Sequence, residues 1–433
     1  MIIQKRNPWS WVSTLYFAEG LPYVAVMTVS LIMFKRFGVS NSDIAFYTSW
    51  LNLPWVIKGL WSPFVDILKT KRWWIITMQL LIGAALGGVA FSLPTPHWFQ
   101  ISMAFFWLLA FSSATHDIAA DGFYMLGLND TDQAFFVGIR NTFYRLATIS
   151  GQGLLIYLAG YLENAHLPKF AQTIGNIPFA WSVTFIVMGL CMLLFGIYHY
   201  FILPKPSADV SIETKTAKEI FIEFGRTFGS FFTKKNSILA ISFLLFYRFS
   251  EAQLQKISPL FLIDGLEKGG LGLSTTAYAT VYGVVGVIAL IAGGILGGIV
   301  IAKGGLHKWI WPMVLCMCMP NLTSIYFAYA QPQSLWIINA GIAFEQFGYG
   351  FGFTAYTLFM IYFSKGEHKT AHYAICTGFM ALSMMLPGMF AGRIQEWIGY
   401  QHFFIWVMIC SIVPIILVAL VKPKLEKEKP VSE

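Results

Sequence analysis

Residues 111 to 124 read Phe111-Ser-Ser-Ala-Thr-His-Asp-Ile-Ala-Ala-Asp-Gly-Phe-Tyr124, and they end an apolar run that begins at residue 98 and is long enough to cross a membrane. If this run is one helix, Asp117 and Asp121 lie one turn apart on the same face. Ionisable side chains at bilayer depth are costly and usually face a bundle interior or an aqueous cavity. The stretch therefore predicts a polar functional site inside a membrane protein.

The composition of the whole chain is that of an integral membrane protein. Of its 433 residues, 57% are hydrophobic and only 12% are charged, which is far from the balance of a soluble globular protein. The net charge of +8 does not indicate nucleic-acid binding, because Lys and Arg gather in short segments between apolar runs. The five cysteines include no Cys-x-x-Cys pair, so we expect no disulfide framework and no metal site, and we predict no cofactor.

Hydropathy divides the chain into twelve apolar runs of about 20 residues or more. The segments on one side of these runs hold nineteen Lys and Arg residues against four on the other side, which predicts that both termini are cytoplasmic. The fold class that follows is an all-α integral membrane protein with twelve transmembrane helices in a lipid bilayer. The runs cover residues 8–34, 41–65, 73–93, 98–124, 132–161, 178–202, 237–264, 274–302, 308–330, 334–364, 370–398 and 399–421.

The longest polar segment, residues 203–235, separates the sixth run from the seventh. Large apolar residues recur in it at near-helical spacing, so it is either an amphipathic helix on the inner membrane surface or a partly ordered cytoplasmic linker. On this division we predict an N-terminal six-helix half over residues 1–202, a C-terminal six-helix half over residues 236–421, and a disordered tail over residues 422–433.

Two halves of six runs indicate an internal duplication. Tyr16-Phe-Ala-Glu-Gly20 in the first run resembles Arg248-Phe-Ser-Glu-Ala252 in the seventh, at an offset of 232 residues. Asp117 in the fourth run falls near Glu345 in the tenth, at an offset of 228 residues. The two halves thus place acidic residues at corresponding depths.

A loop signature points to a known superfamily. Gly298-Ile-Val-Ile-Ala-Lys-Gly-Gly-Leu-His-Lys308 fits the Gly-x-x-x-Asp-(Arg/Lys)-x-Gly pattern of the major facilitator superfamily, with Ala302 in place of the Asp. The corresponding loop of the first half keeps Asp66 and a basic end but loses the glycines. The chain therefore resembles that superfamily, whose two halves are parallel repeats around a substrate site at the bilayer midplane.

A sharper resemblance lies in residues 53 to 66, Leu53-Pro-Trp-Val-Ile-Lys-Gly-Leu-Trp-Ser-Pro-Phe-Val-Asp66. They match the Leu-Pro-x-x-x-Lys-x-Leu-Trp-x-Pro-x-x-Asp run of the AmpG-type muropeptide permeases. The segment from residue 116 to residue 124 is similar to that family's Gln-Asp-Ile-x-x-Asp-Ala-x-Arg run, and it departs from the pattern at His116, Gly122 and Tyr124.

The resemblance implies an inner-membrane (cytoplasmic membrane) permease that imports cell-wall muropeptides, GlcNAc-anhydroMurNAc peptides, together with protons. Related permeases move siderophores or acetyl-coenzyme A, so another large anionic or amphipathic solute, such as a siderophore or an acyl-CoA-like compound, stays an alternative. We expect a glycopeptide and a proton as the bound partners, no nucleic acid, and a monomer. A membrane enzyme would present a catalytic loop or metal motif and a receptor would carry a soluble output domain, so we predict a transporter and no enzyme.

The acids inside the spans are the candidates for proton coupling: Glu19, Asp117 and Asp121. Glu19 is the first choice, because it shares a helix face with Tyr16 and Tyr23 beside a Gly-Leu-Pro sequence that can bend the helix. The alternative is that these acids belong to a permanent ion network that fixes helix packing. His116 is interpreted in the same two ways, as a group that titrates near neutral pH or as a hydrogen-bonded packing residue.

Substrate contact is expected from charged and aromatic residues of the same spans. The resemblance implies Lys58 and Arg145, whereas Arg140 lies closer to a helix end and could merely reach the interface. In the seventh run Arg248 and Glu251 either bind substrate or pair with each other. The full set is Lys58, Arg145, Arg248, Glu251, Gln255, Glu345, Tyr16 and Tyr23. The resemblance further implies that Asp66, Lys71 and Arg72 gate the cytoplasmic side.

Overall fold

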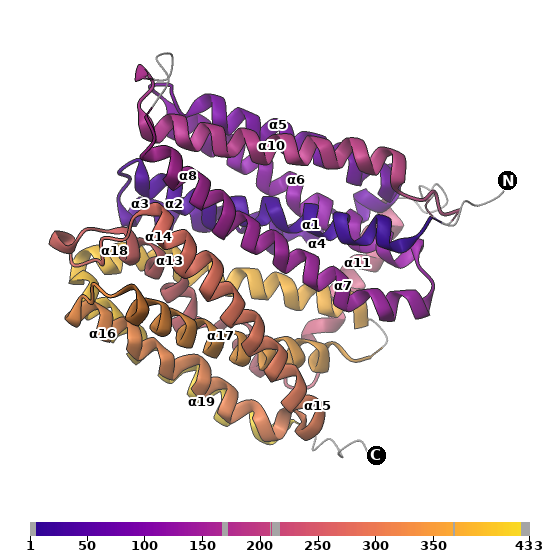
Figure 1. Ribbon diagram of the computed structural model, residues 1–433. Coiled ribbons are helices and arrows are strands. Elements are labelled where there is room, and N and C mark those ends of the chain that lie inside the picture. The colour runs from indigo at the N-terminus through magenta and orange to yellow at the C-terminus, as the bar shows by residue number, and fades with distance from the viewer. Residues whose placement is uncertain (1–5, 167–171, 208, 210–216, 367–368, 426–433) are drawn as a thin grey trace. The chain divides into compact units, whose positions relative to one another are not determined.

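The computed structural model describes residues 6–166, 172–207, 209, 217–366 and 369–425, and these residues form helices and loops without a strand (Figure 1). The all-α prediction is confirmed. The α-helices are α1 (Val12–Val24), α2 (Ser30–Arg36), α3 (Asn41–Trp50), α4 (Leu53–Leu68), α5 (Lys71–Ser92), α6 (Trp98–Gly127), α7 (Asp130–Ile149), α8 (Ile156–Glu163), α10 (Asn176–Ile202), α11 (Ala217–Phe232), α12 (Ser237–Phe246), α13 (Phe249–Ile263), α14 (Thr275–Tyr278), α15 (Val287–Cys318), α16 (Leu322–Ala330), α17 (Leu335–Ser364), α18 (Lys369–Cys410) and α19 (Ile412–Val421).

Several helices join through π-helical turns into longer runs. The turns Ala25–Val29, Ser150–Leu155 and Ala279–Gly286 connect α1 to α2, α7 to α8, and α14 to α15. In the described part of the chain, six helical runs are long and apolar enough to cross a membrane. The predicted count of twelve is consistent with the helical segments, most of which begin and end within a few residues of the apolar runs.

Helix ends follow from local chemistry. Ser40, Thr70 and Asn129 accept a hydrogen bond from a backbone N–H in the first turn of α3, α5 and α7, respectively. Gly305 inside α15 and Gly399 inside α18 have φ angles of 71° and 74°, a left-handed conformation that glycine adopts without strain. These two glycines divide α15 and α18 where the sequence predicts turns between apolar runs.

Residues in contact fall into two compact units. The first unit comprises residues 1–37 and 57–222, and the second comprises residues 38–56 and 223–433. α3 therefore belongs to the second unit, in which it packs against α18 and α13. Inside this unit the side chain of Asn41 donates to Gln395 at 2.7 Å, and Lys256 donates to Thr48 at 3.0 Å.

In the first unit α5 packs along α6 and α10, and α1 packs along α7 and α6; Figure 1 shows α5 and α10 side by side. Trp11 and Phe123 are fully buried where α1 meets α6, with their ring centroids 5.3 Å apart. This contact brings the acidic face of α6 next to α1, so Glu19 and the two aspartates are on neighbouring helices.

In the second unit α15 and α17 pack against each other through glycines. A Cβ added at Gly293 would lie 2.1 Å from the carbonyl oxygen of Phe347, and one added at Gly350 would lie 2.1 Å from that of Leu290. Only a residue without a side chain allows this approach. Beside the crossing, Tyr247 and Tyr356 are buried and stack with centroids 5.6 Å apart.

The predicted linker contains α11, whose C-terminal end packs onto the second unit. Phe231 is fully buried against Phe363 and Phe379, and Ser230 Oγ lies 2.9 Å from His372 Nε2. The segment is therefore helical over Ala217–Phe232, while its position on a membrane surface and the predicted halves stay predictions. Most of the predicted C-terminal tail, residues 426–433, lies outside the described residues.

Candidate functional site

The first unit contains an ion pair between α4 and α6. Lys58 Nζ donates to Asp117 Oδ2 at 2.5 Å, and the exposed fractions of the two side chains are 23% and 17%. The charge of Asp117 is thus balanced by the lysine that the sequence singles out. Such a pair in a bundle interior is stable only while both members are charged or both are neutral.

Asp121 is bound by a second cation, from α7. Arg140 Nη1 donates to Asp121 Oδ1 at 3.1 Å and to the Tyr16 hydroxyl at 2.9 Å, and the Tyr16 hydroxyl donates to Asp121 at 3.0 Å. The guanidinium also lies over the rings of Tyr16 and Tyr124, 4.8 and 5.1 Å from their centroids. Arg140 therefore belongs to the charge cluster, although its place near a helix end had left open that it merely reaches the interface.

Glu19 is the third acid of this cluster. It is 8% exposed, it interacts electrostatically with Asp117, Asp121 and Arg140, and its Oε2 atom has no hydrogen-bond partner among the described residues. The cluster thus holds three acids, Glu19, Asp117 and Asp121, and two bases, Lys58 and Arg140. Because each base is bound to an aspartate, Glu19 is the acid left without an ion pair among the described residues.

The sequence also singles out Arg145, Tyr23 and Tyr124 in the first unit. Arg145 is half-buried on α7 and forms neither a hydrogen bond nor an ion pair with the described residues. Tyr23 lies against Tyr144, with ring centroids 6.4 Å apart. Tyr124, which stands where the permease pattern has a basic residue, donates its hydroxyl to the backbone oxygen of Gln133.

His116 belongs to a chain of buried hydrogen bonds on the other side of α6. Its Nε2 atom lies 2.9 Å from the Gln79 amide nitrogen, and the Gln79 amide oxygen lies 2.9 Å from His199 Nδ1. His199 Nε2 in turn lies 2.9 Å from the hydroxyl of Thr14. The chain joins α6, α5, α10 and α1, and sequence spacing could not reveal it, because its members come from four separate helices.

Two of the predicted gating residues lie at the start of α5. The backbone N–H groups of Lys71 and Arg72 donate to the two carboxylate oxygens of Asp209, at 2.7 and 3.1 Å. Arg72 also donates to the backbone oxygen of Tyr200 and lies over its ring. The side chain of Asp66 lies outside the described part of the chain. Asp209 thus binds the helix N-terminus, a favourable place for a carboxylate.

In the second unit the predicted residues Arg248 and Glu251 do not form an ion pair. Arg248 donates to the hydroxyl of Tyr349 and lies over the ring of Phe353, 4.9 Å from its centroid. Glu251 instead accepts from Gln255 Nε2 at 2.7 Å, and its second carboxyl oxygen has no partner among the described residues.

From Glu251 the hydrogen bonds continue to Glu345. The Tyr282 hydroxyl donates to Gln255 Oε1 at 2.8 Å, and Gln346 Nε2 donates to the Tyr282 oxygen at 3.2 Å and to Glu345 Oε1 at 3.3 Å. Ser324 Oγ donates to Glu345 Oε2 at 3.1 Å. We call this set, Glu251, Gln255, Tyr282, Gln346, Glu345 and Ser324, the acid chain.

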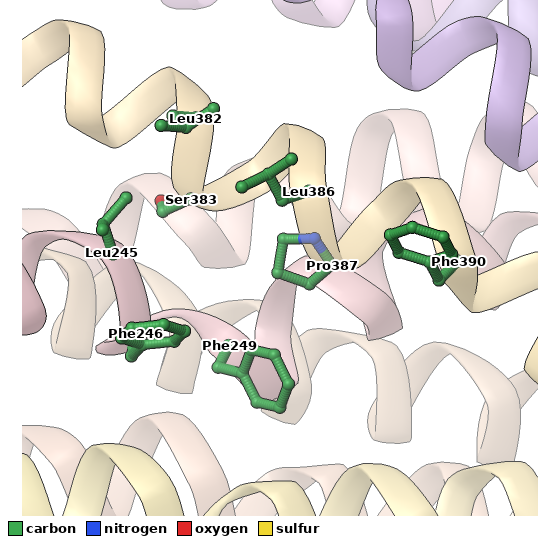
Figure 2. A pocket seen from close by; sticks show the side chains of 8 residues that line it. All are labelled: Leu245, Phe246, Phe249, Leu382, Ser383, Leu386, Pro387 and Phe390. Carbon is green, nitrogen blue, oxygen red and sulfur yellow. The ribbon is translucent and has the colours of Figure 1, made fainter.

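An apolar hollow of about 240 Å³ lies in the second unit, beside the short interruption of the helix between α12 and α13. Figure 2 shows Phe246 and Phe249 on one side of it and Leu386, Pro387 and Phe390 of α18 on the other. Ser383 is its sole polar lining residue, and none of the predicted site residues lines it. The hollow lacks the convergent polar groups that a glycopeptide would need. No group of three metal-ligating side chains occurs among the described residues.

Comparison with known proteins gives these clusters a context. A family model described as Major Facilitator Superfamily matches residues 12–371. The chain belongs to the major facilitator superfamily. The fold agrees, because the structure of a D-xylose-proton symporter superimposes with a TM-score of 0.72 at 13% identity, over 97% of this chain and 98% of the other.

Two curated relatives refine the position of this major facilitator protein. It is 24% identical to a putative transporter AmpG 4 of Rickettsia conorii, over 91% of each chain. It is 23% identical to the anhydromuropeptide permease of Escherichia coli (strain K12), over 95% of this chain and 79% of the relative. The predicted likeness to AmpG-type permeases is confirmed, and the chain is a multi-pass membrane transporter and no enzyme.

Proposed function

We propose that this transporter imports cell-wall muropeptides, GlcNAc-anhydroMurNAc peptides, across the cytoplasmic membrane together with protons. The solute is inferred from similarity to the anhydromuropeptide permease of Escherichia coli and from the likeness of residues 53 to 66 to the AmpG-type permeases. The proton is inferred from the charge cluster of the first unit. Transport then proceeds by alternating access in a monomer whose two termini face the cytoplasm.

The proposal of proton coupling rests on Glu19, the acid of the cluster that has no ion pair. Lys58 and Arg140 balance Asp117 and Asp121, so an ionised Glu19 would be an uncompensated charge with only 8% of its surface exposed. Such a group is far more stable when it binds a proton. Release of that proton requires that water or a cation reach Glu19, which alternating access provides on the cytoplasmic side.

Arg145 is the substrate contact that we favour in the first unit. Because it makes no ion pair with the described residues, its guanidinium keeps all its donors for the carboxylate of a peptide. Lys58 is already bound to Asp117, so it can contact an anionic solute only if that pair opens. Tyr16 is held by Asp121 in the same way.

Proteoliposomes test the proposal directly. Purified protein should accumulate a labelled anhydromuropeptide when an inward proton gradient is imposed, and Glu19→Gln should abolish the accumulation while it leaves exchange across the membrane intact. Glu163→Gln is the matched control, since Glu163 is equally buried but is bound by Arg36 at 3.1 Å. Equal uptake with and without the gradient would refute proton coupling. Gradient-driven uptake of a siderophore or an acyl-CoA compound in place of the muropeptide would refute the proposal that the solute is a muropeptide.

A further inference from the structure

The second unit holds a surplus acid of its own, at the position that corresponds to Asp117. Glu251 and Glu345 are each 1% exposed, and the acid chain joins them through hydrogen bonds without a basic side chain. The described bases of this unit that lie in its helical core bind elsewhere: Arg248 binds Tyr349, and Lys256 binds Thr48. At most one of the two carboxyl groups therefore has a cation nearby.

The surroundings of the two acids differ in the charges and helix positions that they contain. Glu251 lies in the first turn of α13, where backbone N–H groups and the helix dipole favour a negative charge, and Arg248 interacts with it electrostatically. Glu345 is the eleventh residue of α17 (Leu335–Ser364), away from both helix ends. The groups that face it are Glu251, Ser324, Gln346 and Tyr282, which are neutral or negative.

The internal duplication explains why Glu345 lacks a base. Asp117 is balanced by Lys58, and at offsets of 228 to 232 residues the place of Lys58 falls within Gly286-Val-Ile-Ala-Leu290. This segment of the eighth apolar run contains no ionisable residue. The second half thus keeps the acid and has lost its cation.

We propose that Glu345 is a second proton-binding site of this transporter, held neutral in the substrate-free protein and connected to Glu251 by the acid chain. Its proton resides on Oε2. The Ser324 hydroxyl can rotate to accept a hydrogen bond from this O–H group, while Oε1 continues to accept a hydrogen bond from Gln346. On protonation a hydronium ion on the open side donates its proton and leaves as water, one O–H bond forms on the carboxylate, and one negative charge of the protein disappears.

Infrared difference spectroscopy of the full chain in lipid nanodiscs tests this placement. The spectrum should contain the C=O stretches of the protonated carboxyl groups of Glu345 and Glu19. Glu345→Gln should remove one of the two bands, whereas Glu163→Gln should leave both unchanged. Ser324→Ala, which deletes one hydroxyl and leaves Glu345 in place, should shift the band that Glu345→Gln removes, because the carboxyl group loses its partner. A spectrum of Glu345→Gln that superimposes on that of the native protein would overturn the proposal, as would an unshifted band in Ser324→Ala.

A transport measurement adds a second readout, which rests on the proposed proton coupling. The reversal potential of uptake should indicate one proton fewer per solute for Glu345→Gln than for the native chain, and an unchanged stoichiometry would count against Glu345. The proposed proton-binding roles of Glu345 and Glu19 can be refuted independently of each other. Loss of coupling in Glu345→Gln with normal coupling in Glu19→Gln would refute the role of Glu19 alone, and the carboxyl band assigned to Glu345 should persist in Glu19→Gln.

Discussion

Asp117 and Asp121 lie one turn apart on α6, but cations from two different helices bind them, Lys58 from α4 and Arg140 from α7. The two aspartates therefore tie α6 to both of its charged neighbours at the same depth. A movement of α4 or α7 relative to α6 would have to break one pair without disturbing the other. The contribution of each ion pair to the free energy of unfolding can therefore be measured separately.

The pair of Lys58 and Asp117 should show strong coupling in a double-mutant cycle. Lys58→Met should lower the free energy of unfolding by about 3 kcal/mol, because it leaves Asp117 charged and unpaired in an apolar bundle. The double variant Lys58→Met/Asp117→Asn should recover much of that loss, since it buries no unpaired charge. Thermal unfolding of detergent-solubilised protein measures all four proteins. Losses that simply add would contradict the pairing.

Replacing Arg140 should lower the free energy of unfolding, whereas replacing Arg145 should leave it unchanged. Arg140→Gln removes the ion pair with Asp121 and the contacts with two tyrosine rings, so we expect a loss of about 1 to 2 kcal/mol in the free energy of unfolding. Arg145→Gln is the matched control on the same helix, and its unfolding should be unchanged while uptake falls. The assignment would be wrong if Arg145→Gln were the more destabilised of the two.

The crossing of α15 and α17 depends on Gly350. Gly350→Ala places a methyl group 2.1 Å from the backbone oxygen of Leu290, so the helices must separate, at a cost of about 3 kcal/mol. Gly298→Ala on α15 is the control, because nothing lies within 4 Å of its added Cβ. That change should be neutral, or stabilising by up to about 1 kcal/mol through helix propensity. Equal melting temperatures for the two variants would show that the close approach is not required.

Lys234 should anchor α11 to the end of α17. Its ammonium donates to the backbone oxygens of Phe363 and Lys365, at 2.5 and 2.8 Å, where the helix leaves carbonyl groups unpaired. Lys234→Met should therefore cost about 0.5 to 1 kcal/mol. Limited proteolysis should also become faster in the segment between α10 and α12. The exposed neighbour Lys235 offers the comparison, and Lys235→Met should behave as the native chain does.

Much of the fold could be predicted from the sequence, because apolar runs report directly on helices that need a lipid or protein environment. The boundary between the apolar runs 370–398 and 399–421 predicts a turn at Gly399, and the positive φ of that residue confirms it. The membership of α3 in the second unit could not be predicted in the same way. Hydropathy gives the length of a helix but carries no information about which helix it packs against.

The candidate site was only partly predictable. Spacing along one helix correctly brings Gln255 next to Glu251 and places the two aspartates on one face of α6, since these relationships are local. The pairing of Asp121 with Arg140 rather than Arg145 depends on the rotation of α7 against α6, which the sequence does not contain. The role of Tyr282 is not predictable from spacing either, because Tyr282 lies in a π-helical turn where the regular spacing of side chains is lost.

The assignment of α3 also bears on how the chain is made. α3 is synthesised near the N-terminus, whereas α13 and α18, against which it packs, follow only after the whole of residues 57–222. During synthesis Asn41 therefore lacks its hydrogen bond to Gln395, and Thr48 lacks the one from Lys256, until these two residues have left the ribosome and entered the membrane. The helices of the second unit can complete their packing only late in translation. An early release of the chain would leave α3 exposed to lipid or to a chaperone.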